Sequence, residues 1–103
     1  MSDPRAIFIT GAGAGIGAET ARLFARNGWL IGASDLDGAA LESLQRELGA
    51  GCVSVHPADV RDRAALGGAV RDFVARTGGR LDALFANAGV LFMGPDDTIT
   101  PQQ

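Results

Sequence analysis

Short apolar runs alternate along the chain with longer segments in which apolar residues recur at helical spacing. The runs at 6–10, 29–34, 52–55 and 81–86 predict strands. The segments at 15–27, 37–48 and 62–76 predict helices, and glycine or aspartate stands at nearly every joint between the two kinds. Strands that alternate with single helices imply a parallel sheet with right-handed crossovers, so the chain is expected to form an α/β fold.

The residues of each predicted helix indicate its buried face and its ends. In the first helix Ile16, Thr20, Leu23 and Phe24 are spaced i, i+4, i+7 and i+8 and are expected to share one face. Asp37 is the predicted N-cap of a second helix with Leu41, Leu44 and Leu48 on one face, and Asp62 opens a third with Leu66, Val70, Phe73 and Val74. From Val90 the pattern predicts a loop that enters another helix near Thr100.

Composition and charge exclude several classes of protein. The 103 residues fit at most one globular domain, and 9 basic against 12 acidic residues leave no basic surface for nucleic acid. The longest apolar stretches are too short to cross a bilayer, and residues 1–5 do not resemble a signal peptide. A single Cys52 and no Cys/His cluster argue for a reducing cytoplasm and against a structural metal.

A glycine-rich turn lies directly between the first strand and the first helix, in the segment Thr10-Gly11-Ala12-Gly13-Ala14-Gly15-Ile16-Gly17. Glycine lets the backbone turn sharply and approach a pyrophosphate, which the amides of a helix N-terminus can hold. The glycines fit two spacings, Gly13-Gly15-Ala18 and Gly11-Gly15-Gly17. We favour the second, because the strand ends at Thr10 and Gly17 then falls inside the helix, where it can pack close to the sheet.

This turn resembles the cofactor loop of the short-chain dehydrogenase/reductase family. The resemblance implies a doubly wound Rossmann-type sheet, of which the chain holds the first four strands and three helices. It also implies that Gly11, Gly15 and Gly17 cradle the pyrophosphate of a nicotinamide dinucleotide and that Ile16 offers its amide. Residues 1–103 are therefore expected to be the N-terminal part of one dinucleotide-binding domain.

Asp35 lies 18 residues after Gly17, close to the spacing of an acid that binds the adenosine ribose 2′-hydroxyl. A carboxylate repels a 2′-phosphate, and Ala14 and Leu36 add no positive charge, so NAD is expected rather than NADP. In the alternative, Asp35 only caps the next turn and Asp37 binds the ribose; Asp37 is better placed as a helix N-cap.

Two further segments take a role from the family resemblance. Asp59-Val60, after the third strand, is expected to meet the adenine, with the Asp side chain or nearby backbone at its exocyclic amine. Asn87-Ala88-Gly89 resembles the family's Asn-Asn-Ala-Gly signature, with Ala86 in place of the first Asn. In the family this segment steadies the central sheet and lines the nicotinamide-ribose side of the cofactor, and Asn87 can serve either purpose.

Other chemically active residues receive no functional role. His56 is expected to be a loop residue, Cys52 a small buried hydrophobe, Trp29 a packing residue at a strand start, and Asp96-Asp97 part of a solvated loop.

The chain has no Tyr and no Lys, so no catalytic residue is assigned. The family oxidises alcohols or reduces ketones with a Tyr, a Lys and a Ser, assisted by an Asn. We therefore expect the cofactor-binding half of a longer NAD-dependent oxidoreductase that forms dimers or tetramers. A sheet of four parallel strands would also have only one helix on its second face and an open apolar edge at 81–86. The alternative from another class is a non-catalytic dinucleotide-binding or dimerising module. The glycine spacing argues against an extended-branch epimerase, and Asn87-Ala88-Gly89 against a methyltransferase.

Overall fold

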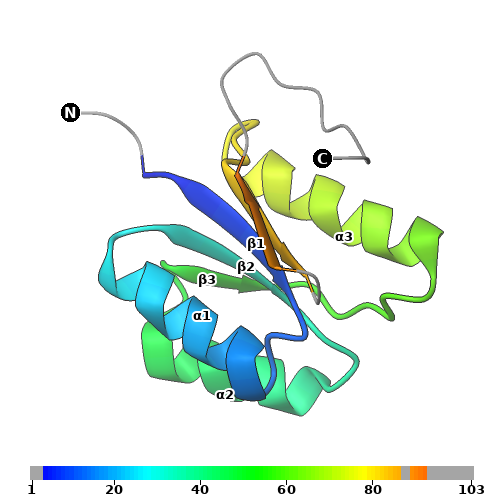
Figure 1. The fold of residues 1–103 in the computed structure, drawn as a ribbon, viewed down its shortest axis with the longest axis horizontal. Helices are drawn as coiled ribbons and strands as arrows, with labels where there is room; N and C mark the ends of the chain where they lie inside the picture. The colour runs from blue at the N-terminus through cyan, green and yellow to red at the C-terminus, as the bar shows by residue number, and fades with distance from the viewer. Residues whose placement is uncertain (1–3, 87–88, 93–103) are drawn as a thin grey trace.

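The structure, a computed structural model, describes residues 4–86 and 89–92, and within them the predicted alternation of strands and helices is confirmed (Figure 1). The elements are β1 (Ala6–Thr10), α1 (Gly15–Arg26), β2 (Leu30–Ser34), α2 (Gly38–Leu48), β3 (Val53–Val55), α3 (Arg63–Arg76), β4 (Ala83–Ala86) and β5 (Gly89–Phe92). Predicted and observed ends differ by at most two residues from β1 to β4, which is the usual uncertainty at fraying ends.

The strands form one sheet in the order β3-β2-β1-β4-β5, with the first four parallel. Helices α1 and α2 cover one face and α3 covers the other (Figure 1). All five residues of β1 are buried: Ile7 and Ile9 belong to one core cluster, and Ala6 and Phe8 to the other. This is the doubly wound α/β arrangement that the sequence predicts, including the single helix on the second face.

The antiparallel strand β5 was not predicted. It runs beside β4 with Ala86 opposite Gly89 and Ala83 opposite Phe92, so the expectation of a loop is wrong for residues 90–92. The rest of that predicted loop and the helix expected near Thr100 lie outside the described residues. The expectation of an open edge at 81–86 is wrong for the same reason. An unpaired strand exposes a row of N–H and C=O groups, and the apolar segment that follows β4 satisfies them. The prediction of a loop rested on proline residues farther along the tail.

The buried face of α1 also differs from the prediction. Ile16 and Leu23 are 74% and 49% exposed, whereas the small residues Gly17, Ala18 and Ala21 are buried against the sheet. Ile16 and Leu23 therefore form an outward stripe, whereas Phe24, from the same predicted face, is partly buried and packs against the core as expected. Close approach to the sheet requires small residues on the inner face, and hydrophobic spacing alone does not reveal that requirement.

Helices α2 and α3 follow their predicted patterns. Leu41 and Leu44 are the buried residues of α2, and Phe73 of α3 packs over β2. A Cβ added at Gly32 would lie 2.5 Å from the Phe73 ring, so glycine at this position lets α3 dock on the sheet.

Candidate functional site

The turn between β1 and α1 requires glycine at three positions. Gly11 and Gly15 have φ of 66° and 60°, a region that L-residues with a Cβ rarely adopt. Gly17 lies at the other extreme, since a Cβ there would overlap the carbonyl oxygen of Gly11 and come within 2.7 Å of its carbonyl carbon. The turn is thus folded back tightly on the first turn of α1, and these are the glycines of the favoured spacing.

The N-terminus of α1 differs from those of the other two helices in the described part of the chain. Asp37 caps α2 by accepting from the Ala40 N–H at 3.1 Å, and Asp62 caps α3 by accepting from the Ala65 N–H at 3.1 Å. Ala14, at the N-cap of α1, makes no side-chain cap. The first amides of an α-helix have no partner within the helix, so this end presents N–H donors and a positive dipole to whatever lies beyond it.

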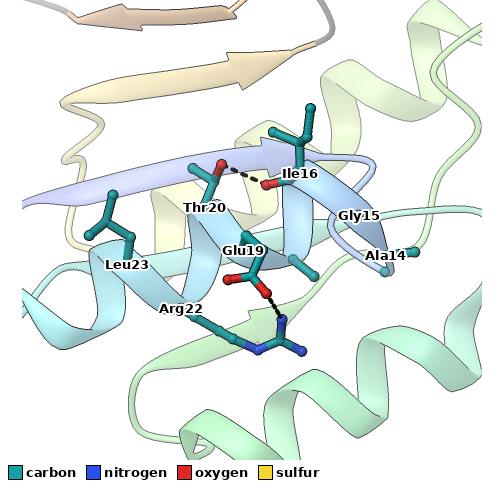
Figure 2. Close-up of a pocket in the computed structure, with 9 residues that line it drawn as sticks. Ala14, Gly15, Ile16, Glu19, Thr20, Arg22 and Leu23 are labelled. Carbon is teal, nitrogen blue, oxygen red and sulfur yellow. Dashed lines mark hydrogen bonds and ion pairs between the residues drawn. The ribbon is translucent and has the colours of Figure 1, made fainter.

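A cavity of about 530 Å³ lies beside this end of α1, lined by residues from Gly13 to Leu23 (Figure 2). Ile16, Thr20 and Leu23 follow one side of the helix in Figure 2, while Glu19 and Arg22 follow another and form an ion pair of 2.9 Å. The exposed apolar stripe noted above therefore forms one wall of a hollow that begins at the glycine-rich turn.

Asp35 fastens the end of β2 to the same turn. Its Oδ2 accepts from the Gly13 N–H at 2.9 Å, and its Oδ1 accepts from the Asp37 N–H at 3.0 Å. The Ala12 N–H also donates to the Ser34 carbonyl oxygen at 3.0 Å. Each carboxylate oxygen has a second acceptor site, so Asp35 can hold the turn and still accept a hydroxyl.

A second cavity, of about 190 Å³, is lined in part by Gly11 of the same turn. It brings together residues from three loops, namely Gly11, Asp35, Leu36, Ala58, Asp59, Val60 and Arg61. The Ala58 N–H donates to the Asp35 carbonyl oxygen at 3.2 Å, which joins two of these loops. Leu36 and Val60 are 67% and 47% exposed, so the cavity offers apolar surface between two carboxylates. The predicted cofactor-binding residues up to Val60 therefore line one of the two cavities or belong to the glycine-rich turn.

Asp59 is paired with Arg61. The carboxylate accepts from the Arg61 backbone N–H at 2.9 Å and from Nη2 and Nε of the guanidinium at 2.9 and 3.1 Å. This pairing lowers the pKa of Asp59 from its usual range, so the side chain is a carboxylate at neutral pH.

The Asn87-Ala88 part of the predicted signature lies outside the described residues, as does Asp96-Asp97. Gly89 is the first residue of β5, opposite Ala86. Cys52 is partly buried against the core, which raises the pKa of its thiol, and Trp29 packs edge-on against Phe24 at 4.8 Å between ring centroids.

His56 follows β3 directly as a loop residue, as predicted, and its side chain is buried, with 4% exposed. Its Nε2 is 2.7 Å from the Ser54 Oγ, and its Nδ1 is 2.9 Å from Oδ2 of Asp72 in α3. Burial lowers the pKa of this imidazole, and the carboxylate of Asp72 opposes that shift. The side chain thus ties α3 to the edge strand on the face away from α1.

Two elements of the site escaped the sequence analysis. Arg61 stands two residues after Asp59, and that spacing was a readable signal for an Asx-type loop with a side-chain pair. The contact of Gly13 with Asp35 joins positions 22 residues apart, and no local pattern marks it.

No helix in the described part of the chain is long and apolar enough to cross a membrane. Among residues 4–86 and 89–92, no group of three or more His, Cys, Asp or Glu side chains is arranged to hold a metal ion.

Comparison with known proteins places this geometry in a family. The family model described as short chain dehydrogenase matches residues 5–103. Short-chain dehydrogenase reductase 5 of Arabidopsis thaliana is 36% identical over 89 residues, which are 86% of this chain and 34% of that protein. D-threitol dehydrogenase of Mycolicibacterium smegmatis is 36% identical over 102 residues, which are 97% of this chain and 39% of that protein.

A solved structure has the same fold. The 3-ketoacyl-(acyl-carrier-protein) reductase of Brucella melitensis, complexed with NADH, superposes with a TM-score of 0.74 and 30% identity over 80% of this chain and 33% of its own. The chain therefore spans about a third of the length of the relatives it matches.

Proposed function

The chain belongs to the short-chain dehydrogenase family, and on that premise we propose that it is the cofactor-binding part of an NAD(H)-dependent oxidoreductase that acts on an alcohol or ketone.

The observation that carries the proposal is the uncapped N-terminus of α1 at the glycine-rich turn. Helices α2 and α3 each have an aspartate at the N-cap that accepts from a first-turn amide, whereas α1 has Ala14 at its N-cap. A pyrophosphate placed there accepts hydrogen bonds from free amides and meets the positive end of the helix dipole. Because Gly11, Gly15 and Gly17 have no side chains, the backbone of the turn can come close to the pyrophosphate.

The second cavity fits the adenosine end of the same molecule. Leu36 and Val60 supply apolar surface for a flat base, and the Asp59 carboxylate can accept from an exocyclic amine. Asp35 can accept from a ribose 2′-hydroxyl and repels a 2′-phosphate, which supports NAD over NADP. When bound, the nicotinamide would accept or donate the hydride that interconverts alcohol and ketone. The role of this chain is to position that cofactor.

The rest of the reaction is assigned to residues beyond this chain. Since the sequence contains neither Tyr nor Lys, we propose that the acid/base tyrosine, the lysine and the serine of the family belong to a longer protein. Asn87, Ala88 and Gly89 are proposed to border the nicotinamide ribose. A cytoplasmic location and a homodimer or homotetramer complete the proposal and rest on the sequence and on the family.

The proposal is tested by titrating the purified protein with NAD⁺ and NADP⁺ in a calorimeter and by assaying alcohol-dependent reduction of NAD⁺. We expect NAD⁺ to bind at least about tenfold more tightly than NADP⁺. An Asp35→Asn variant should lose most of that preference, while Asp37→Asn, which removes a neighbouring charge and keeps the α2 cap, should retain it. Residues 1–103 alone are expected to bind without hydride transfer, so the activity assay uses the longer protein. Binding without hydride transfer by that protein would favour a non-catalytic dinucleotide-binding module, and no binding of either dinucleotide would overturn the proposal.

A further inference from the structure

One residue that lines the small cavity beside Asp35 is positively charged, and the family motif does not explain its presence. Of the residues that line it, Asp35 and Asp59 are negative and Arg61 is positive. The Arg61 side chain is 80% exposed, so it is free to swing over the mouth of the cavity unless something holds it. A guanidinium is well suited to bind a phosphate through paired hydrogen bonds. Its presence is therefore unexpected in a pocket argued to exclude a 2′-phosphate.

The geometry of Asp59 explains how this cation is held. The guanidinium meets the carboxylate through Nη2 and Nε at 2.9 and 3.1 Å, and the Arg61 backbone N–H adds a third bond at 2.9 Å. An exposed ion pair is usually weak, but a fork-shaped contact between residues two apart, anchored by the backbone, has the favourable geometry. Asp59 is also the less exposed partner, with 29% of its side chain accessible.

We propose that Asp59 is a specificity-determining residue, because it holds the Arg61 guanidinium away from the adenosine ribose and so leaves the pocket with a net negative charge. This inference rests on the proposed function and extends it. Cofactor choice would then depend on two carboxylates: Asp35 acts directly at the 2′-position, and Asp59 acts by occupying the cation that could otherwise bind a 2′-phosphate.

Three variants of the purified protein test this: Asp59→Asn, Arg61→Gln and the double variant. For each, the dissociation constants of NAD⁺ and NADP⁺ are measured by calorimetry, together with those of ADP and 2′,5′-ADP, which lack the nicotinamide. The readout is the ratio of the two affinities. Any adenine contact that Asp59 makes is shared by both ligands of a pair and cancels in the ratio.

We expect Asp59→Asn to shift the ratio toward the 2′-phosphorylated ligand by about tenfold, the range of a hydrogen bond to a charged group. The double variant should return to within about twofold of wild type, and Arg61→Gln alone should not favour NADP⁺. If Asp59→Asn leaves the ratio unchanged, or if its shift survives in the double variant, the inference is wrong while NAD binding by the wild type still supports the proposed function. If the wild type binds neither dinucleotide or prefers NADP⁺, both fail.

Discussion

Helices α1 and α3 begin in opposite ways, although both follow a strand of the same sheet. The N-terminus of α3 is closed by its own Asp62, which accepts from the Ala65 N–H. The N-terminus of α1 has no side-chain cap and is instead folded against the glycine-rich turn through Gly17. The first amides of α3 are satisfied by a side chain of the same helix end, whereas those of α1 are left for the pyrophosphate that we propose to bind there. The difference suggests a test of the proposed function: if α1 binds the cofactor, the missing cap at its first turn is the feature that permits it.

The largest expected effect comes from filling the space between α1 and the turn. In a Gly17→Ala variant the new Cβ would overlap backbone atoms of Gly11, which cannot move aside as a flexible side chain can. We expect the free energy of unfolding to fall by about 3 kcal/mol or more, measured by urea denaturation. Gly68→Ala, inside α3, is the matched control.

At Gly68 nothing lies within 4 Å of an added Cβ, so that substitution should stabilise the protein by up to about 1 kcal/mol through helix propensity. Equal effects at Gly17 and Gly68 would contradict the close packing of α1 on the turn.

A second prediction gives α1 the cap that α3 has. Ala14 has an extended backbone, with φ of −160° and ψ of 167°, which suits an N-cap residue. Ala14→Asp should stabilise the helix by about 0.5–1 kcal/mol and weaken NAD⁺ binding by about tenfold or more, because the new carboxylate occupies the amides and repels the pyrophosphate. Denaturation and calorimetry measure the two effects.

Ala14→Asn separates these causes, since it caps the helix without adding charge. We expect it to stabilise the helix similarly and to weaken binding less. Unchanged NAD⁺ affinity in the Asp variant would show that the end of α1 does not hold the pyrophosphate.

The converse change removes the cap from α3. Asp62→Ala should lower the free energy of unfolding by about 1 kcal/mol and leave NAD⁺ affinity within about twofold of wild type, because this end meets no ligand in the proposed site. Asp62→Ser, which can still cap, should recover most of the stability. A large loss of NAD⁺ affinity in Asp62→Ala would remove the distinction between the two helix ends.

Most of this comparison could be anticipated from the sequence. The caps at Asp37 and Asp62 were predicted and are confirmed, because capping is a local interaction between residues three apart. The order of strands and helices was likewise predictable from apolar runs and glycines. The contact between Asp35 and the Gly13 amide was not, since it depends on how β1 and β2 align in the sheet.

The errors have a common physical origin in competition between elements. Hydrophobic spacing suggested that Ile16 and Leu23 face the sheet, but close backbone approach at Gly17 rotates them outward. Local pattern suggested a loop after Gly89, but the free edge of β4 is paired there by β5. His56 is a loop residue, as expected, but its burial under α3 was not anticipated. Each error concerns a contact between segments that no local pattern records.

The smallest predicted effect is a pH dependence of the free energy of unfolding, which arises from His56, the side chain that links α3 to the sheet. Burial lowers the folded-state pKa of His56, the neighbouring Arg76 acts in the same direction, and Asp72 opposes both. Folding therefore favours the neutral imidazole of His56. Its contribution to the free energy of unfolding is fully present above the unfolded-state pKa of about 6.5 and is lost as pH falls below that value. Asp59, Asp82 and Glu47 have lowered pKa values, so their contributions are lost only at more acidic pH.

The free energy of unfolding should thus decline gently between pH 7 and pH 5, by less than the loss of the α3 cap, with urea denaturation at each pH as the measurement. His56→Gln, which can bond Ser54 but cannot titrate, should flatten that decline even if it lowers stability at every pH. An equal slope in wild type and variant would assign the pH dependence to another group. A flattened slope would show that α3 is held to the sheet by a side-chain contact that titrates in this range, whereas the close packing of Gly17 in α1 on the backbone of Gly11 does not titrate.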